Sequence, residues 1–428
     1  MNLKNVIYIF IFLFSGAIFS QEMGSAYKKK VLDAAEVESL FSYYDQKGDN
    51  AAVTGGEGTE KLSDATANLI VKLPLNADDI LTVDIGISAY TSASSSNINP
   101  LDGSNQNISP FNASSGASSK DALIHFKGAY SHSSDDRNSI WGANIYYATE
   151  YDYSSIGFGG NYAMLFNEKN TEVSLNGQVY LDQWKPQYPI ELRGNFFDDR
   201  ITGNGTYTNN FNEFSNVNRN SYSLSLGLSQ ILGKRLQGSL FADVIVQDGL
   251  LSTPHQRVYF SDVDDFFIDD FQLADDVEKL PNSRVKYPVG GRLNYYLNDK
   301  IVLRSYYRLY NDNWGITSHT ASLEVPAKLN DNFTIYPNYR YYTQSRANYF
   351  YPKEIALSNF KYYTSDYDLS NFDAHQYGIG IRYKDLLANT KILGFGLKSL
   401  DLRGSMYNRS TGLDSFIVSF GTVFVYSK

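Results

Sequence analysis

The sequence of 428 residues contains no cysteine and has only four methionines and five histidines. The absence of cysteine excludes disulfide bonds, thiolate chemistry and a lipid anchor on an amino-terminal cysteine. A net charge of −9, with no long basic patch, argues against nucleic acid as a partner. Beyond the amino terminus, no apolar run approaches the roughly 18 residues that a membrane-spanning helix requires. The sequence therefore excludes a disulfide scaffold and a helical membrane protein.

The amino terminus is typical of a secretory signal. Lys4 precedes an apolar run from Val6 to Phe19, and small Ser20 and polar Gln21 follow. This pattern predicts a signal peptide over residues 1–20, with cleavage after Ser20. The protein is therefore expected to be exported, with residues 21–36 forming a periplasmic segment.

Tyrosine and phenylalanine are abundant, with 35 and 26 copies, and many of them fall in segments that alternate in polarity. The clearest pair covers residues 289–297 and 301–310, on either side of a polar turn at residues 298–300. One face of this pair carries Leu, Ile, Val and Tyr, whereas the other carries arginines. A period of two around a tight polar turn predicts a β-hairpin. The same period recurs at residues 81–89, 141–150, 172–182, 222–229 and 416–426.

The predicted connections between these segments differ in length. Short turns are expected near residues 76–79, 133–138, 167–170, 233–235, 298–300 and 330–332. Long polar loops are expected at residues 91–120, 186–220, 250–284 and 345–375. An alternation of short turns with longer loops is typical of bacterial outer-membrane barrels.

These patterns predict an all-β fold, an antiparallel up-and-down transmembrane β-barrel of about 16 strands, with about 14 or 18 also compatible. The barrel is expected to cover residues 37–428, with residues 37–46 as its first strand and both termini on the periplasmic side. The polarity phase slips at residues 385–398, which predicts a bulge or a split strand. A soluble propeller or sandwich is the competing fold, but no internal repeat supports a propeller, and open sheets would leave edges unpaired.

Several local motifs, taken together, resemble an uncharacterised exported family known as domain of unknown function 3570. They are TGGEGTE at residues 54–60, LPNSR at 280–284, GITSHT at 315–320, YRYYTQ at 339–344 and YYTSDYDLS at 362–370. The resemblance runs from about Phe41 to the end of the chain. It implies an outer-membrane barrel of certain Gram-negative bacteria, whose genes neighbour thioredoxin-like proteins, a small lipoprotein and a flavin transferase. It implies no substrate and no catalytic residues.

Extending the phase of the hairpin to the other strands predicts which side chains face the lumen. The later strands contribute a basic wall, made of Arg292, Arg304, Arg308, Arg340, Arg382 and Arg403 and interleaved with Tyr306, Tyr310, Tyr336 and Tyr342. The earlier strands contribute an acidic wall, made of Asp84, Glu150, Glu172, Asp182 and Asp243, with Lys127 as an exception. A transverse field of this kind would orient anionic or dipolar solutes, and arginine makes bidentate contacts to carboxylate or phosphate.

The loop at residues 262–278 holds eight carboxylates and three phenylalanines. Its candidate site residues are Asp262, Asp264, Asp265, Asp269, Asp270, Asp275 and Asp276. In one interpretation the loop folds inward as a constriction that faces the arginines; in a second, arginine and aspartate form a network that plugs the barrel. A third leaves the loop outside in solvent. Calcium binding has less support, because the spacing lacks the glycine and terminal glutamate of a helix-loop-helix site.

Catalysis has weak support in the sequence. The five histidines are His125, His132, His255, His319 and His375. His375 near Asp373 and His132 near Asp135 are the nearest approach to a hydrolase site, and such neighbours in polar loops arise by chance. The glycine-rich segment at residues 55–58 lacks the Lys-Ser or Lys-Thr of a phosphate loop. We therefore expect no enzymatic activity, no cofactor and no metal site.

Two functions remain open from the sequence. The first is a porin-like channel or specific transport barrel for small polar, anionic solutes, located in the cell outer membrane. The alternative is a non-conducting scaffold or assembly partner, which would bind a small lipoprotein or another envelope protein. In both cases the expected surroundings are outer-membrane lipid and lipopolysaccharide, and nucleic acid is not expected as a partner.

Overall fold

The structure is a computed structural model of the chain. It describes residues 30–58, 60–91, 120–186, 188–193, 196, 198–208, 217–269, 271–386, 390–392 and 394–426. The expected signal peptide and most of the expected periplasmic segment lie outside the described residues, as does most of the predicted loop at residues 91–120. Within the described parts, no helix has the length and apolar character needed to cross a membrane.

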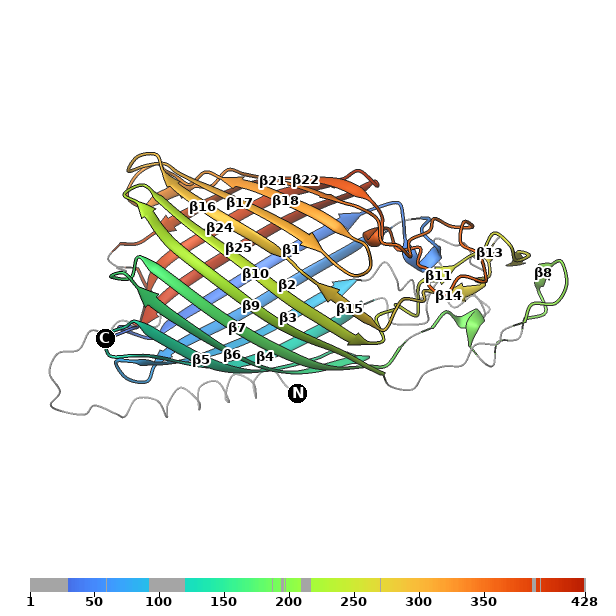
Figure 1. Ribbon diagram of the computed structural model, residues 1–428, viewed down its shortest axis with the longest axis horizontal. Coiled ribbons are helices and arrows are strands. Elements are labelled where there is room, and N and C mark those ends of the chain that lie inside the picture. Colours follow the sequence, from blue (N-terminus) through green and yellow to red (C-terminus); the bar gives the residue numbers. More distant parts are fainter. Residues whose placement is uncertain are drawn as a thin grey trace.

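The described strands form one closed antiparallel barrel of 16 strands, as the alternating segments predicted (Figure 1). Each strand pairs with its neighbours along the chain, and the first strand pairs with the last, Glu36 lying opposite Val425 and Lys47 opposite Asp414. Closure leaves the wall without free sheet edges, which accounts for the stability of this arrangement over a long open sheet.

The wall is made of twenty strand segments, because three of its sixteen strands are each broken in two and the short extra piece β23 pairs with the start of β24. A proline lies in each break, Pro288, Pro326 and Pro337, and proline has no N–H to donate to the ladder. The unbroken strands are β1 (Glu36–Lys47), β2 (Leu62–Pro74), β3 (Asp79–Thr91), β4 (Lys120–Ser133), β5 (Ser139–Thr149), β6 (Tyr153–Phe166), β7 (Thr171–Trp184), β9 (Val217–Gly233), β10 (Leu236–Gly249), β17 (Val302–Asn311), β22 (Phe372–Lys384), β24 (Phe395–Arg409) and β25 (Leu413–Tyr426). The broken ones are β15 (Ser283–Lys286) with β16 (Val289–Tyr296), β18 (Thr317–Glu324) with β19 (Ala327–Lys328), and β20 (Phe333–Ile335) with β21 (Asn338–Gln344), while β23 (Lys391–Ile392) is the short piece beside β24.

The predicted irregularity near residues 385–398 is confirmed. The register of β24 against β25 shifts between Leu397 and Ser399, and β23 forms a short hairpin with the start of β24. An extra residue in one strand re-phases the side chains that follow it.

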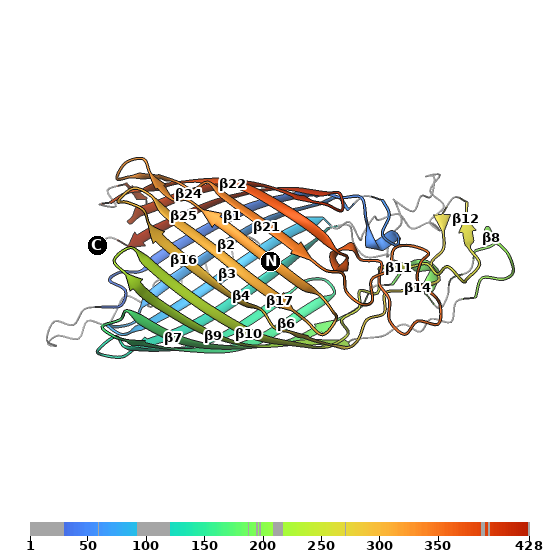
Figure 2. The same cartoon turned by 45° about the horizontal axis from the view of Figure 1, so that its top comes forward.

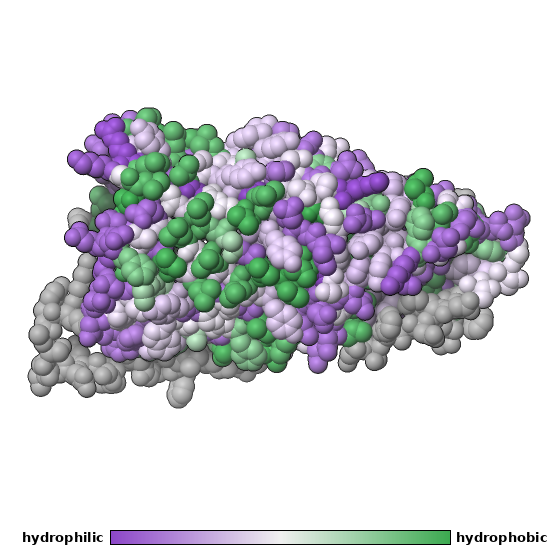
Figure 3. All heavy atoms as spheres, viewed as in Figure 1, coloured by the Kyte–Doolittle hydropathy of each residue, from purple (hydrophilic) through white to green (hydrophobic). Residues whose placement is uncertain are grey.

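Large apolar side chains cover the outer surface of the barrel. Leu240, Ile379 and Met406 are 65%, 61% and 62% exposed, and each belongs to the apolar phase of its strand. Figure 3 shows green and pale residues over the barrel wall, whereas purple residues gather at one end and on the opposite extension. An apolar outer belt with polar side chains inside is the arrangement of a barrel that faces lipid.

The two ends of the barrel differ. One end, here called the turn end, carries the connections β2–β3, β4–β5, β6–β7, β9–β10 and β16–β17 and both ends of the wall, Glu36 and Tyr426. The other, the loop end, carries the long loops. The predicted alternation of lengths holds only in part, because three connections at the loop end, residues 150–152, 312–316 and 410–412, are also short.

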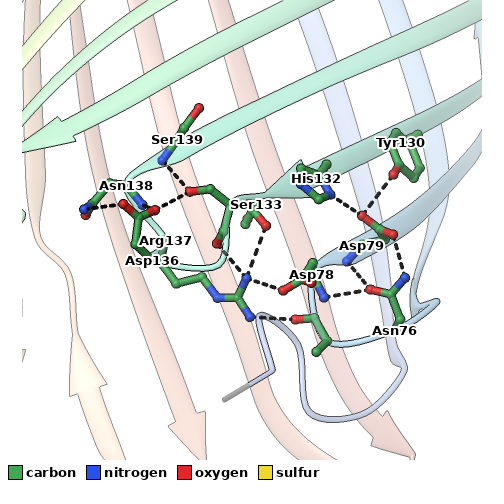
Figure 4. Close-up of polar contacts among 12 residues, drawn as sticks. Asn76, Asp78, Asp79, Tyr130, His132, Ser133, Asp136, Arg137, Asn138 and Ser139 are labelled. Carbon is green, nitrogen blue, oxygen red and sulfur yellow. Dashed lines mark hydrogen bonds and ion pairs between the residues drawn. The ribbon is translucent and has the colours of Figure 1, made fainter. Parts of the chain in front are cut away.

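The turn end is held by side chains that link neighbouring turns (Figure 4). Arg137, in the β4–β5 turn, donates to the carboxylate of Asp78 and to the Ala77 carbonyl in the β2–β3 turn. It also donates to the carbonyls of Ser133 and Ser134 in its own turn. One guanidinium with several donors therefore ties two hairpins together.

Beyond the loop end, four connections fold into one compact body, here called the cap (residues 48–61, 185–208, 250–282 and 345–371, as far as described). It contains η1 (Ala52–Thr54), η3 (Ile190–Leu192), β8 (Ile201–Gly203), β11 (Arg257–Val258), β12 (Phe266–Ile268), β13 (Phe271–Gln272), β14 (Asp276–Val277) and η4 (Tyr367–Leu369). Figures 1 and 2 both show β8, β11 and β14 outside the barrel, past its loop end, where Figure 1 also labels β13 and Figure 2 labels β12. Apolar clusters such as Ile268, Phe271 and Leu273 form its core.

Candidate functional site on the inner wall of the barrel

The six arginines of the predicted basic wall lie on neighbouring strands. Arg292 is on β16, Arg304 and Arg308 are on β17, and Arg340, Arg382 and Arg403 are on β21, β22 and β24. Most alternate with an exposed apolar neighbour, such as Leu293, Tyr307 or Leu402, and Arg304 shares the phase of Arg308, so all six point to the inner face.

Three of these arginines form a network with two carboxylates near the turn end. Glu324 accepts from Arg304 at 2.9 Å and from Arg403 at 3.2 Å. Asp401 accepts from Arg403 at 2.8 Å and from Arg382 at 2.7 Å. Two strands of the wall separate β18 from β24, so the contact between Glu324 and Arg403 runs through the lumen rather than along the sheet.

Tyr336 lies within this network. Its ring is 5.3 Å from the guanidinium carbon of Arg382 and 5.0 Å from that of Arg403, and only 4% of the residue is exposed. The face of an aromatic ring attracts a cation, so Tyr336 helps to hold the two like charges close together. Carboxylates and an aromatic ring therefore hold Arg382 and Arg403 in place together.

The other three arginines have a different environment. Arg292 lies over Tyr306 at 5.5 Å and Arg308 over Tyr310 at 5.9 Å, while the buried Nε of Arg308 has no hydrogen-bond partner within the described part of the chain. Among the described residues, Arg292, Arg308 and Arg340 form no ion pair with a carboxylate. Two carboxylates facing six guanidinium groups leave this wall with a net positive charge.

Glu324 and Asp401 were not singled out from the sequence. Both occupy the inward phase of their strands, as Arg382 and Arg403 do, so parity alone would have placed them on the basic wall. The contact between β18 and β24 has no local signal, because it joins residues that are 79 positions apart.

The predicted acidic wall lies on the earlier strands. Its members share the inward phase, opposite exposed residues such as Ile87, Leu175 and Leu240. Asp84 lies 3.5 Å from Nε2 of His125 and pairs across the sheet with Lys127. Glu150, just beyond β5, accepts a hydrogen bond of 2.5 Å from Tyr90. Glu172, Asp182 and Asp243 are on β7 and β10.

The acidic loop at residues 262–278 belongs to the cap. Asp262 is exposed and accepts from the N–H and hydroxyl of Ser358, and Asp264, Asp265 and Asp269 are also exposed. Asp275 accepts from the Phe260 N–H and Asp276 from the Tyr363 hydroxyl. Asp270 lies outside the described residues. The structure therefore places the described part of this loop beside other cap segments rather than against the inner arginines.

The cap contains a fully buried ion pair. Nε of Arg257 lies 2.6 Å from Oε1 of Glu191, the two side chains are 1% and 0% exposed, and Arg257 also donates to the Val53 carbonyl. The pair therefore joins three of the four cap loops. Such a pair is strongly destabilised when one partner alone is removed, because an uncompensated charge stays buried.

Buried carboxyl groups surround this core. Burial, helped by nearby Asp366, raises the pKa of Glu278 to about 8. Burial, with Asp368 close by, raises the pKa of Asp366 to about 6. The pKa of Asp275 is raised to about 6, chiefly by burial and then by Asp265. Near neutral pH the Glu278 carboxyl in the cap is therefore largely protonated.

The two histidines that the sequence singled out contact further polar side chains, and His375 also interacts electrostatically with Asp373. His132 lies 2.6 Å from Asp79, which also accepts from Tyr130, on the outer face near the turn end (Figure 4). Nδ1 of His375 lies 2.8 Å from the Tyr339 hydroxyl. Within the described residues, no group of three or more His, Asp or Glu side chains is placed to hold a metal ion.

Three solved structures with a related shape are distant from this chain in sequence. A bacterial polysaccharide outer membrane secretin is 11% identical, with a TM-score of 0.44, over 93% of this chain and 100% of its own. The siderophore receptor PirA from Acinetobacter baumannii is 10% identical, with a TM-score of 0.42, over 90% of this chain and 54% of its own. A Pseudomonas aeruginosa FadL homologue is 10% identical, with a TM-score of 0.41, over 92% and 91%. At these values the function has to be inferred from the chain's own geometry.

No curated protein matches the chain. A family model described as "Protein of unknown function (DUF3570)" matches residues 91–401. This range takes in most of the barrel, four of the five motifs that suggested the resemblance, and five of the six inward arginines. The chain therefore belongs to this family, DUF3570.

Proposed function

We propose that this barrel is a channel or specific transport barrel for small polar, anionic solutes in the outer membrane. The observation that carries the proposal is the set of three inward arginines, Arg292, Arg308 and Arg340, that have no carboxylate partner among the described residues. An apolar outer belt supports the location, and outer-membrane lipid and lipopolysaccharide are the proposed surroundings.

The proposed mechanism is diffusion past a positively charged wall, without a chemical step. Arginine offers several donors in a fixed plane, so a carboxylate or phosphate group can exchange part of its hydration for guanidinium contacts. The contacts must also be weak enough to release the solute, and a wet lumen screens them accordingly. The paired arginines lie closer to the turn end than the unpaired ones, and their ion pairs fix their positions in the lumen.

The direct test is conductance of the purified protein in planar bilayers. We expect steady open-channel currents with an anion preference that falls, or reverses, in Arg308→Glu. Lys300→Glu provides the matched control, because Lys300 lies in an exposed turn outside the wall and carries the same charge change. Silence of the folded wild-type barrel would contradict the proposal, as would an equal effect of the two variants.

A non-conducting scaffold is the second candidate, and the cap favours it. Four loops that share buried clusters and a buried ion pair offer a rigid surface of the kind that a lipoprotein or another envelope protein could bind. Silence in bilayers, together with co-purification of a specific envelope protein that is lost when Glu191→Ala loosens the cap, would support this alternative. In neither candidate does the protein act as an enzyme.

A further inference from the structure

A second set of cations lies at the loop end of the lumen, just below the cap. Its first member is Arg284, part of the motif at residues 280–284. Arg284 stacks on Trp314 at 4.4 Å and donates to Oδ2 of Asp312 through Nε at 2.9 Å and Nη2 at 2.5 Å. The stacking and the ion pair fix the orientation of this guanidinium.

Two further cations belong to the same set. Lys286 lies on β15 two residues after Arg284, so both side chains point into the lumen. Lys286 interacts electrostatically with Arg284, Arg219 and Asp312. Arg219, on β9, lies over the Trp184 ring at 5.7 Å. Strand β10 pairs with both β9 and β15, so these cations are brought together from strands that are two steps apart in the wall.

Two carboxylates, Asp312 and Glu278, interact with this set and balance only part of its charge. The side chain of Asp312 is fully buried and already accepts from Arg284, from the Tyr310 hydroxyl at 2.8 Å and from the backbone N–H of Trp314. Glu278 in the cap is within electrostatic range of Arg219, but burial raises the pKa of Glu278 to about 8, so most of it is uncharged at neutral pH. Among the described residues, neither Lys286 nor Arg219 forms an ion pair.

We infer that Arg219, Arg284 and Lys286 form a binding site for an oxyanion group, a phosphate or a carboxylate, at the loop-end mouth of the lumen. The inference deepens the proposed function, on which it rests for its role in transport. Tyr310 connects the two regions, because its hydroxyl donates to Asp312 while its ring lies under Arg308. A solute released from the mouth site would therefore meet the unpaired arginines of the wall next.

The donor set suits a tetrahedral or planar oxyanion better than a halide. Two guanidinium groups with fixed orientation supply directional N–H donors, and the ammonium of Lys286 adds a point charge. Phosphate carries more charge than a monocarboxylate at neutral pH, so we expect it to bind more tightly, and chloride to bind least.

Equilibrium binding tests the site without relying on transport. Inorganic phosphate would be titrated by calorimetry into the full-length protein in detergent, at constant ionic strength. We expect Lys286→Met and Arg219→Gln each to weaken phosphate binding by about tenfold, or about 1.4 kcal/mol, because each variant removes one charged donor to the phosphate. Lys300→Met at the turn end is the control and should bind phosphate as the wild type does.

Tryptophan fluorescence supplies an independent readout. The chain has three tryptophans, and two of them, Trp184 and Trp314, each stack against one arginine of the proposed site. In Trp141→Phe, which removes the third, phosphate should change the emission with the same affinity as in calorimetry. Arg219→Gln should shift that titration by about tenfold.

The outcomes separate this inference from the proposed function. No phosphate binding by the folded protein, or binding that Lys286→Met and Arg219→Gln both leave unchanged, would overturn the mouth site even if the barrel conducts anions. Phosphate binding in a barrel that is silent in bilayers would keep the mouth site and overturn the channel. If Lys286→Met does not fold, Arg219→Gln still decides.

Discussion

Arginine occupies two contrasting environments in this protein, the core of the cap and the inner wall of the barrel. Arg257 in the cap is 1% exposed and is fully matched by Glu191. Arg308 in the wall stacks on Tyr310 and is partly exposed, and no carboxylate among the described residues pairs with it. A buried charge must be matched or the fold loses stability, whereas a charge beside water can stay unmatched and act on solutes.

The arginines of this protein therefore divide into those that stabilise the fold and those that are free to contact solutes. Arg304, Arg382 and Arg403 are intermediate, because they share two carboxylates inside the lumen. If this distinction is correct, variants in the cap should change stability without altering anion selectivity. Variants of the unpaired wall arginines should alter anion selectivity without changing stability.

The largest effect is expected for the buried pair of the cap. Arg257→Met should destabilise the cap by about 3–5 kcal/mol, because it leaves the Glu191 charge buried and unpaired. Limited proteolysis and hydrogen exchange of residues 188–193 and 250–280 would measure this loss. The double variant Arg257→Met with Glu191→Leu should recover much of it, and a double variant as unstable as the single one would contradict the interpretation.

The next effect is a dependence of cap stability on pH. The folded pKa of Glu278, about 8, lies above its ordinary value of 4.5, so the folded cap retains a proton that the unfolded chain releases between these values. Cap stability should therefore fall as pH rises from about 5 to 8, by up to about 1.4 kcal/mol per pH unit for this group. Hydrogen exchange, corrected for intrinsic rates, would record the slope.

Glu278→Gln is the matched variant for this dependence. The amide oxygen can still accept from the Thr253 N–H, which lies 2.6 Å from Oε1 in the wild type. The variant should be more stable than the wild type at pH 8 and similar to it at pH 5. Asp366 and Asp275, with pKa values raised to about 6, should leave a smaller residual slope. An unchanged slope in Glu278→Gln would contradict this assignment.

Loss of the carboxylate that two wall arginines share should have a smaller effect. Its effect on anion preference should be opposite in sign to that of losing an arginine. Glu324→Gln removes the partner of both Arg304 and Arg403 and should therefore increase the anion preference of the channel. Reversal potentials in a salt gradient would measure the change, and lowering the ionic strength should enlarge it. A decrease in anion preference would show that these arginines do not face the conducting path.

The smallest effect separates paired from unpaired wall arginines. Arg304→Gln should reduce anion preference less than Arg308→Gln, because Glu324 already offsets the charge of Arg304. Both variants should keep the thermal stability of the barrel within about 1 kcal/mol, because the exposed ion pair of Arg304 contributes little and Arg308 has no ion pair to lose among the described residues. Equal reversal potentials for the two variants would remove the distinction between paired and available arginines.

Much of the barrel could be predicted from the sequence because its signal is local. Alternation such as Leu293, Tyr295 and Leu297 against Arg292 and Asn294 states the strand and its two faces within a few residues. The even strand count and the bulge near residues 385–398 follow from the same phase. The inward direction of the six arginines depends on nothing more distant than their neighbours.

The cap and the pairing of charges were decided only by the tertiary structure. Arg257 meets Glu191 across 66 positions, and Arg403 meets Glu324 across 79, so neither contact has a local pattern. The acidic loop at residues 262–278 has the composition of a constriction, yet two of its three phenylalanines, Phe266 and Phe271, pack in the cap with residues such as Ile201 and Leu273. Period-two polarity determines which face a side chain takes, but only the assembled loops determine which charges are buried together and which stay free.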